Sequence, residues 1–160
     1  MSEFQVRPVK KEDRQWVDEV LTGKWGSARS VSRGRLYQAL DLPGFVAVQK
    51  GKLVGLVTYR VEGNECEITT MNSLIERKGI GTALVDAVKS VAVKAGCKRI
   101  WLVTTNDNTE ALRFWQKRGF NFKAVYPNAV EDSRKLKPEI PKIGDHGIPI
   151  KDEIEMEMIL

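Results

Sequence analysis

A glycine-containing loop that leads directly into a long amphipathic helix is the feature that most restricts how this chain can fold. The loop reads Glu76-Arg77-Lys78-Gly79-Ile80-Gly81-Thr82, and strand-like residues precede it. Gly96 provides the left-handed residue that commonly ends a helix. Between them, apolar residues recur at the spacing of one buried helical face: Ile80, Leu84, Ala87, Val88, Val91 and Ala95. The segment therefore predicts a helix from Ile80 to Gly96 that begins at a glycine loop.

The same loop has the properties of a binding site for phosphate groups. Gly79 and Gly81 let a ligand approach the backbone closely, and the free N–H groups and positive dipole end of the helix favour an anion. Arg77 and Lys78 add cationic side chains beside those donors. The alternative is an ordinary helix preceded by a glycine turn, because Gly-x-Gly is a weak motif by itself. The chain has no Gly-Lys-Ser/Thr sequence, and Leu84 occupies the third glycine position of the dinucleotide-binding pattern, so neither motif is present.

Composition predicts one globular domain spanning residues 1–160, since 42% of the residues are hydrophobic and 29% are charged. No apolar run reaches the length of a membrane span or a signal-peptide core, so we expect a cytoplasmic protein without a membrane partner. The formal charge of +5 suits an anionic ligand, but the basic residues are dispersed and nucleic-acid binding is not indicated. Cys66 and Cys97 lack metal-ligand spacing, so we expect reduced structural cysteines and no metal.

Hydrophobic periodicity predicts strands and helices that alternate along the chain. Strands are expected at residues 4–9, 44–49, 53–61, 65–71, 99–104, 120–126 and 153–160, and helices at 12–22, at 80–96 and from the polar cluster 105–108 to 119. Gly23 is expected to end the first helix, and residues 24–35 to form a loop or a broken short helix. Residues 127–149, rich in Pro, Lys and Gly, are expected to hold at most one short helix near 130–137. This order predicts a mixed sheet with helices on its faces.

Two segments carry a recognisable pair of motifs: Glu76 to Leu84 reads E-R-K-G-I-G-T-A-L, and Asn108 to Phe120 reads N-T-E-A-L-R-F-W-Q-K-R-G-F. They resemble the Q/R-x-x-G-x-G/A pyrophosphate loop and the N-x-x-A-x-x-F-Y-x-x-x-G-F helix of the GNAT superfamily of acyl-CoA-dependent N-acyltransferases. The motifs stand in the family's order with one strand between them, and the element order matches through to Leu160. The resemblance implies an α/β (α+β) fold with a mixed, mostly antiparallel central sheet of about six to seven strands flanked by helices.

The resemblance also implies which residues bind acetyl-CoA, the expected co-substrate. The glycine loop would bind the pyrophosphate, the helix after Asn108 would lie along the pantetheine arm, and a backbone N–H near Met71 would polarise the thioester carbonyl. Asn108 has a structural alternative as the cap of its helix, and it can serve both purposes. The predicted cofactor-binding residues are Met71, Arg77, Lys78, Gly79, Ile80, Gly81, Thr82, Asn108, Ala111 and Trp115.

Two positions depart from the family pattern. Glu76 stands where the family has Gln or Arg, and a carboxylate there would weaken phosphate binding unless it faces away or Arg77 compensates. Trp115 stands where many members have a Tyr that protonates the leaving thiolate, and an indole N–H cannot serve as that acid. Trp115 is expected either to pack on the pantetheine arm or to shape the acceptor pocket, with the thiolate taking its proton from elsewhere.

Glu67 is the predicted general base, because it lies on the strand that enters the glycine loop, where the family often places a carboxylate. Alternation along that strand predicts that Glu65, Glu67, Thr69 and Met71 face one way, so Glu65 is the rival. The alternative for both glutamates is an ordinary solvated strand face, since surface carboxylates greatly outnumber catalytic ones.

The acceptor side of the site is less well defined by the sequence. Trp25 and Arg33 are predicted to bind the acceptor together with Arg29, although a loop tryptophan is commonly a packing residue. His146 sits in a glycine-flanked turn and is expected at the surface. Residues 127–149 are too long for a simple connection, and we expect them to form a lid over the acceptor site.

These observations together predict an N-acetyltransferase that moves the acetyl group directly from acetyl-CoA to an amine, with a small molecule favoured over a protein acceptor. A homodimer is possible. A route through a cysteine nucleophile is the mechanistic alternative. The alternatives of other classes are a non-catalytic acyl-CoA sensor or interaction module, motivated by Glu76 and Trp115, and a basic protein associated with nucleic acid.

Overall fold

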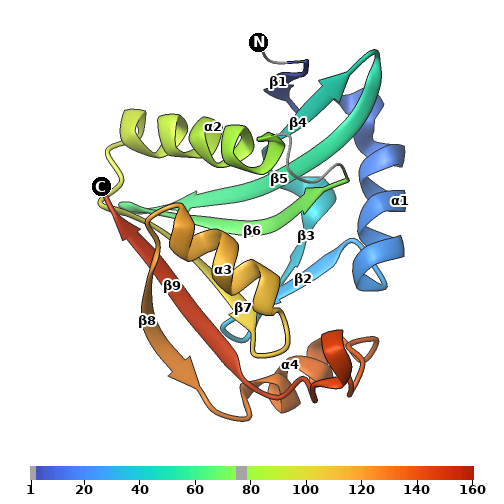
Figure 1. Ribbon diagram of the computed structural model, residues 1–160, viewed down its shortest axis with the longest axis vertical. Coiled ribbons are helices and arrows are strands. Elements are labelled where there is room, and N and C mark those ends of the chain that lie inside the picture. The colour runs from blue at the N-terminus through green and yellow to red at the C-terminus, as the bar shows by residue number, and fades with distance from the viewer. Residues whose placement is uncertain (1–2, 75–78) are drawn as a thin grey trace.

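A seven-stranded sheet forms the centre of the computed structural model, which describes residues 3–74 and 79–160 (Figure 1). The strands lie in the order β1-β4-β5-β6-β7-β9-β8, and β2 and β3 form a separate hairpin. Among these strands only β6 and β7 pair parallel, and every other neighbouring pair is antiparallel. The expected mixed, mostly antiparallel sheet flanked by helices is confirmed.

The strands and helices follow each other through short connections. The strands are β1 (Gln5–Pro8), β2 (Arg29–Ser32), β3 (Arg35–Gln38), β4 (Gly44–Gln49), β5 (Lys52–Glu62), β6 (Glu65–Ser73), β7 (Arg99–Thr105), β8 (Asn121–Tyr126) and β9 (Glu153–Ile159). The helices are α1 (Arg14–Trp25), α2 (Ile80–Lys94), α3 (Thr109–Lys117) and α4 (Ala129–Leu136). Single 3-10 turns lie at Lys11–Asp13, Ala39–Asp41 and Asp145–Gly147.

Helices cover both faces of the sheet, and the alternation of side chains along its strands explains how. On β4 and β5, Ala47 and Val57 pack in the hydrophobic cluster that includes α2, whereas Val46 and Leu56 pack in the cluster that includes α1. Because successive residues of a strand point to opposite faces, α1 and α2 lie on opposite sides of the sheet. Figure 1 shows α2 and α3 over the same face.

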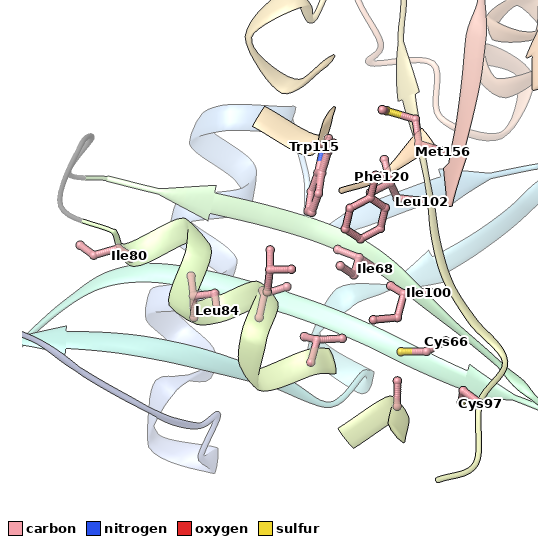
Figure 2. Packing of buried hydrophobic residues seen from close by; sticks show 14 of the residues in the cluster. Cys66, Ile68, Ile80, Leu84, Cys97, Ile100, Leu102, Trp115, Phe120 and Met156 are labelled. Atoms are coloured by element: carbon pink, nitrogen blue, oxygen red, sulfur yellow. The ribbon is translucent and has the colours of Figure 1, made fainter. Parts of the chain in front are cut away.

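The larger cluster is the main core, and α2, α3 and the central strands all contribute to it (Figure 2). The side chain of Phe120, directly after the turn that closes α3, is 2% exposed. The labelled members in Figure 2 are Cys66, Ile68, Ile80, Leu84, Cys97, Ile100, Leu102, Trp115, Phe120 and Met156. The predicted buried stripe of the 80–96 helix is confirmed at Ile80, Leu84 and Val88, but Ala95 is exposed and follows Lys94, where α2 ends.

The first helix ends later than predicted. α1 continues through Gly23 to Trp25, and Gly26, at φ 86°, is the left-handed residue whose N–H donates to the Thr22 carbonyl at 2.9 Å. The prediction that Gly23 ends the helix is wrong, because a glycine inside a helix costs only about 1 kcal/mol relative to alanine and does not by itself stop it.

The prediction of a loop or broken helix over residues 24–35 is also wrong. β2 and β3 pair there with Ser32 opposite Arg35, so only Arg33 and Gly34 form the turn. Both have positive φ, at 47° and 81°. Two consecutive positive φ values define the type I′ turn that matches the twist of a hairpin, but Arg-Gly is an uncommon sequence for it.

Helices α2 and α3 come close together at Gly81. A Cβ atom at this position would lie 2.9 Å from Cε1 of the Phe114 ring and 3.6 Å from Cε of Met71. Next to this contact, Arg118 Nε donates to Thr82 Oγ1 at 2.7 Å and its guanidinium lies 4.6 Å from the Phe114 ring centre. Gly81 is therefore needed for the packing of two helices, whatever it does for a ligand.

We predict that Gly81→Ala destabilises the protein by about 1 kcal/mol or more, because overpacking against Phe114 outweighs the helix propensity of alanine. Gly23→Ala is the matched control, since a Cβ there meets nothing within 4 Å, and it should stabilise the protein by about 0.5–1 kcal/mol. Urea unfolding of both variants measures the difference. A Gly81→Ala protein as stable as Gly23→Ala would contradict the close approach.

Candidate active site

The parallel strands β6 and β7 separate after a short paired stretch, and this opening is the centre of the candidate site (Figure 1). Their register runs from Glu65 opposite Arg99 to Glu67 opposite Trp101. Beyond it, β6 continues to Ser73 and β7 to Thr105. The diverging strands form what we call the fork. Between Ile68 and Asn72, β7 no longer pairs with the inner edge of β6, so backbone groups there can bind a ligand, apart from the Thr69 carbonyl, which accepts from Ser30 Oγ.

A bulge in β6 accompanies the fork. Thr58 of β5 pairs with Thr70, but the next residue, Tyr59, pairs with Ile68, so Thr69 is the extra residue on β6. A bulge changes which face the following side chains point to. Met71 consequently packs in the main core beside Ile68. The prediction that Met71 faces the same way as Glu67 is wrong for this reason, whereas its position on the free part of β6 is compatible with the predicted role of its backbone.

The start of α2 lies where the glycine loop was predicted to bind phosphate. Gly79 adopts φ 75°, and its carbonyl accepts the Ala83 N–H at 3.0 Å, so the helix begins directly after it. An α-helix leaves the first N–H groups without partners inside the helix, which here include those of Ile80 and Gly81. Beside Gly79 a Cβ would meet nothing within 4 Å. The predictions for Arg77 and Lys78 fall outside the described residues, as does the departure at Glu76.

The start of α3 is fixed by side-chain hydrogen bonds. Asn108 Oδ1 accepts the Ala111 N–H at 3.2 Å, so its predicted role as the helix cap is confirmed. Just before it, the buried carboxylate of Asp107 accepts from Thr105 Oγ1 at 2.5 Å and from the Asp145 N–H at 3.1 Å. Contacts of Asn108 and Ala111 with a cofactor stay predictions.

Trp115 belongs to the hydrophobic core. Trp115 is 5% exposed, and its ring contacts those of Phe114 and Phe120 edge to face, with centroids 4.9 and 5.0 Å away. Figure 2 shows Trp115 beside Phe120. Such aromatic pairs add about 0.5–1.5 kcal/mol each to the burial of their area. The indole surface is thus used mainly by the protein itself, and contact between Trp115 and the pantetheine arm stays a prediction.

Glu67 lies at the closed end of the fork and is 1% exposed. Its Oε1 accepts from Arg60 Nε at 2.7 Å. Burial raises the pKa of Glu67 above its ordinary value, although Ser32 and Arg60 both oppose the shift; Ser32 Oγ lies near the carboxylate without a complete hydrogen bond. A buried carboxylate of raised pKa, held by a single guanidinium, has the properties expected of a general base.

The rival carboxylate, Glu65, has a different environment. Arg99 Nε donates to Glu65 Oε2 at 3.0 Å, and the side chain of Glu65 is 43% exposed. Glu65 and Glu67 nevertheless line one cavity of about 110 Å³, together with Arg60, Glu62 and Trp101. The cavity is lined largely by charged groups, so it suits water or a polar ligand next to Glu67.

Strand β2 crosses the fork on the face that carries Glu67. Ser30 Oγ donates to the Thr69 carbonyl on β6 at 3.3 Å. At the other end, Arg33 Nη1 donates to the buried Glu153 of β9 at 3.1 Å, and its guanidinium stacks 3.3 Å from the ring centre of Tyr126 on β8. Arg33 is therefore held by protein groups on this face.

Trp25 and Arg29 border the same region. Trp25, 39% exposed at the end of α1, donates from Nε1 to Asn72 Oδ1 on β6 at 3.3 Å. Arg29 binds both carboxylate oxygens of Glu139, at 2.8 and 2.9 Å. The structure thus brings Trp25, Arg29 and Arg33 to one face of the fork, and their contact with an acceptor stays a prediction.

Residues 127–149 form the helix α4, which packs beside β2, and an irregular segment that includes the 3-10 turn at Asp145–Gly147. Asn106 fixes the end of this segment: its side chain donates to the Pro149 carbonyl at 2.8 Å and accepts the Lys151 and Asp152 N–H groups at 3.0 Å. The predicted short helix near 130–137 is confirmed, and a lid function stays a prediction. His146 lies on an exposed turn with φ 60°, as expected, and hydrogen-bonds Glu110 at 2.6 Å.

Neither cysteine is placed for nucleophilic chemistry. Cys66 and Cys97 are free and buried, as predicted for structural residues. Burial raises the pKa of the Cys66 thiol to about 12, so it is un-ionised at neutral pH. Within residues 3–74 and 79–160, no group of three or more His, Cys, Asp or Glu side chains is arranged to hold a metal ion. None of the described helices is long and apolar enough to cross a bilayer.

Sequence reasoning missed the partner of Glu67, although a signal was present. The turn at Gly63 and Asn64 closes the β5–β6 hairpin, and counting outward from it places Arg60 opposite Glu67. A two-residue turn fixes the register of a hairpin, so this pair could have been predicted. The bulge at Thr69 and the crossing of β2 gave no comparable signal.

Comparisons with known proteins agree with this geometry. The model of the acetyltransferase (GNAT) family matches residues 14–120. The match covers more than half of the chain, and the chain therefore belongs to the GNAT acetyltransferase family, a family of acyltransferases. An uncharacterized Bacillus subtilis strain 168 protein, YdhI, is 47% identical over 137 residues, which are 85% of this chain and 86% of the relative.

Solved structures share the fold at low sequence identity. The IAA acetyltransferase from Bacillus cereus superimposes with a TM-score of 0.76 at 19% identity, over 98% of this chain and 99% of that one. A GNAT family acetyltransferase from Elizabethkingia anophelis, solved with acetyl-CoA bound, has a TM-score of 0.72 at 18% identity over the full length of both chains. These likenesses establish the GNAT fold.

The core position of Trp115 generates a prediction about its replacement. Trp115→Tyr should destabilise the protein by about 1–3 kcal/mol, because the smaller ring leaves a void and brings a hydroxyl into the core. It should not raise kcat. Trp115→Phe is the control, since it has a similar ring without the hydroxyl, and thermal unfolding with steady-state kinetics measures both. A kcat for the Tyr variant well above that of Phe and wild type would instead show that a phenol there acts as an acid.

Proposed function

We propose that this chain is an acetyl-CoA-dependent N-acetyltransferase that acts on a small-molecule amine. The observation that carries the proposal is the fork between β6 and β7, with the start of α2 near one end and the buried Glu67 at the other. An acyl transferase needs a positioned thioester, donors for the developing oxyanion and a base for the amine proton. The fork supplies candidates for each.

The fit to acetyl-CoA rests on free backbone groups. The first N–H groups of α2 suit the pyrophosphate, and the open space beside Gly79 leaves room for it. Asn108, Ala111 and the inner edge of β6 would border the pantetheine arm. Support comes from relatives of the same fold, since structures from Elizabethkingia anophelis and Bacillus subtilis were solved with acetyl-CoA and with CoA.

The residues of this chain have distinct tasks in the proposed reaction. Acetyl-CoA supplies an activated acyl group. The acceptor nitrogen forms a bond to the acyl carbon, the bond from that carbon to sulfur breaks, and the thiolate leaves with the electron pair. The backbone near Met71 stabilises charge on the carbonyl oxygen, and Glu67 takes the proton that the amine loses, directly or through water in the adjacent cavity.

The crossing of β2 supports a small acceptor. Ser30 joins β2 to β6, and Arg33 joins the hairpin turn to β8 and β9, so protein already covers the face of the fork that an extended peptide would occupy. A small amine needs only a space such as the cavity of about 110 Å³ beside Glu67. The fold thus favours a metabolite over a polypeptide terminus.

The proposal is tested by incubating the protein with acetyl-CoA and a panel of amines, and measuring acetylated products by liquid chromatography and mass spectrometry. We expect one or more small amines to gain an acetyl group as CoA is released. The specific alternative is a non-catalytic acyl-CoA-binding module, which Trp115 at the position of the family's acid favours. Binding of acetyl-CoA without any acetylated product would support that alternative and contradict catalysis.

Glu67→Gln should lower kcat/KM roughly 10²- to 10⁴-fold, because it removes the base and keeps the size of the side chain. In the wild type the carboxylate must be ionised to work. Since burial raises its pKa, kcat/KM should fall with decreasing pH at values above the ordinary glutamate range, about 4.3. Protonation of the acceptor amine also lowers kcat/KM as the pH falls. The decrease of kcat/KM at acidic pH is therefore compared between wild type and Glu67→Gln with the same acceptor.

Glu65→Gln is the matched control for this variant, because Glu65 lines the same cavity but binds Arg99. It should keep most of the activity. Native turnover of a folded Glu67→Gln protein at every pH, with activity lost in Glu65→Gln, would transfer the role of base to Glu65.

A further inference from the structure

Three threonine hydroxyls meet at the bulge in β6, next to the neighbouring strand β5 (Figure 1). Thr58 Oγ1 on β5 lies 2.7 Å from Thr69 Oγ1 and 2.5 Å from Thr70 Oγ1. Successive side chains of a regular strand point to opposite faces, so two consecutive residues do not normally reach one atom of the adjacent strand. They do so here because Thr69 is the extra residue of the bulge. We call Thr58, Thr69 and Thr70 the hydroxyl clamp.

Thr58 is suited to bind both of its partners at once. It is only 2% exposed, so little water competes for its hydroxyl. A hydroxyl has one donor and two acceptor sites, and Thr58 can therefore donate to one threonine while it accepts from the other. A regular register would turn one of the two partners to the other face of the sheet and break one of these bonds. The clamp thus stabilises the bulge over regular pairing.

Two further contacts hold the clamp in place. On one side, Gly44 of β4 pairs with Thr58, and a Cβ on Gly44 would clash with the Val57 carbonyl and lie 3.3 Å from Thr58 Cγ2. This close packing restricts rotation of the Thr58 side chain. On the other side, Ser30 Oγ of β2 donates to the Thr69 carbonyl at 3.3 Å. The bulge is therefore fixed by its own side chains and by both neighbouring elements.

The bulge decides which backbone groups of β6 face the fork. Along a strand, successive N–H groups point alternately to the strands on its two sides. An extra residue shifts this alternation by one, so it exchanges the N–H groups that face β5 for those that face the fork. Thr70 and Met71 directly follow the extra residue, where the donor for the thioester carbonyl is proposed. Loss of the bulge would turn that donor away from the carbonyl.

We infer that Thr58 is a positioning residue for acetyl transfer, which through the bulge aims the backbone N–H near Met71 at the thioester carbonyl. The inference rests on the proposed function and adds to it a residue that acts through the backbone of β6 instead of by contact with the acyl group. Misplacement of a catalytic group by about 1 Å can lower a rate roughly 10²-fold, so a hydroxyl outside the reacting centre can control the rate.

The kinetic test compares Thr58→Val, which removes the hydroxyl and keeps the shape, with Thr58→Ser, which keeps the hydroxyl. Thr58→Val should lower kcat roughly 10- to 100-fold and leave KM for the amine nearly unchanged, and Thr58→Ser should restore most of kcat. Thr70→Val removes a partner of Thr58 at a partly buried position. It should act like Thr58→Val and replaces that variant if the buried substitution prevents folding.

Thr22→Val is the control for the exchange of threonine for valine. Thr22 is exposed on α1, and its hydroxyl lies 3.4 Å from Asp18 Oδ1 of the same helix. This variant should have the kcat and KM of the wild type.

A spectroscopic measurement distinguishes positioning from a purely structural role and needs no acceptor. The infrared carbonyl stretch of acetyl-CoA, isotope-labelled at the thioester carbonyl, should lie at lower frequency when bound to wild-type protein than when free, because an N–H donor polarises the bond. Thr58→Val or Thr70→Val should bind acetyl-CoA but lose about half or more of this shift. Thr58→Ser and Thr22→Val should keep it.

The outcomes separate this inference from the proposed function. If the stretch shifts in wild type and the valine variants at the clamp reduce the shift while no amine is acetylated, the positioning role stands and acetyl transfer fails. If amines are acetylated but these variants keep the full shift, the function stands and the inference is overturned, whatever happens to kcat. A stretch that stays at its free value in wild type would also overturn the inference.

Discussion

The separation of β6 from β7 is the constraint on which the rest of this structure depends. Parallel pairing ends at Glu67 and Trp101, and the extra residue Thr69 redirects β6 immediately afterwards. A continuous sheet would satisfy these backbone edges internally and leave no site. The separation instead creates a space between the first turn of α2, the start of α3 and the buried carboxylate of Glu67. The helices and the core hold the two strands in this arrangement, because α2 and α3 pack on the same face.

Arginine residues neutralise the buried carboxylates on the face of the sheet opposite α2 and α3. Glu67 has Arg60, Glu153 has Arg33, and Glu155 has Arg99 together with the hydroxyl of Tyr126. Breaking any one of these pairs would leave a poorly hydrated charge, which costs more than the pair itself contributes. One of these pairs, between Arg33 in the turn after β2 and Glu153 of β9, also helps to hold β2 across the fork. Charge compensation and closure of the acceptor side therefore meet at Arg33.

Local signals in the sequence predicted the elements that depend on local physics. The stripe from Ile80 to Val88 predicted α2, and Asn108 was identified as a cap because a short polar side chain before an apolar helix satisfies a free N–H. The β2–β3 hairpin was missed because Arg33 adopts a positive φ that its type rarely shows. The bulge at Thr69 was missed because it depends on how β6 packs between β5, which pairs antiparallel with it, and β7, which pairs parallel with it.

Amide hydrogen exchange with and without acetyl-CoA tests the central claim most directly, because it reports on the fork and needs no acceptor. The account predicts slower exchange on binding for the backbone of residues 68–73 and for the first turn of α2 from Ile80. The edge strand β8, which β9 separates from β7, should be unchanged. Protection confined to other parts of the chain, with the fork and the start of α2 unaffected, would contradict the assignment of this opening as the cofactor site.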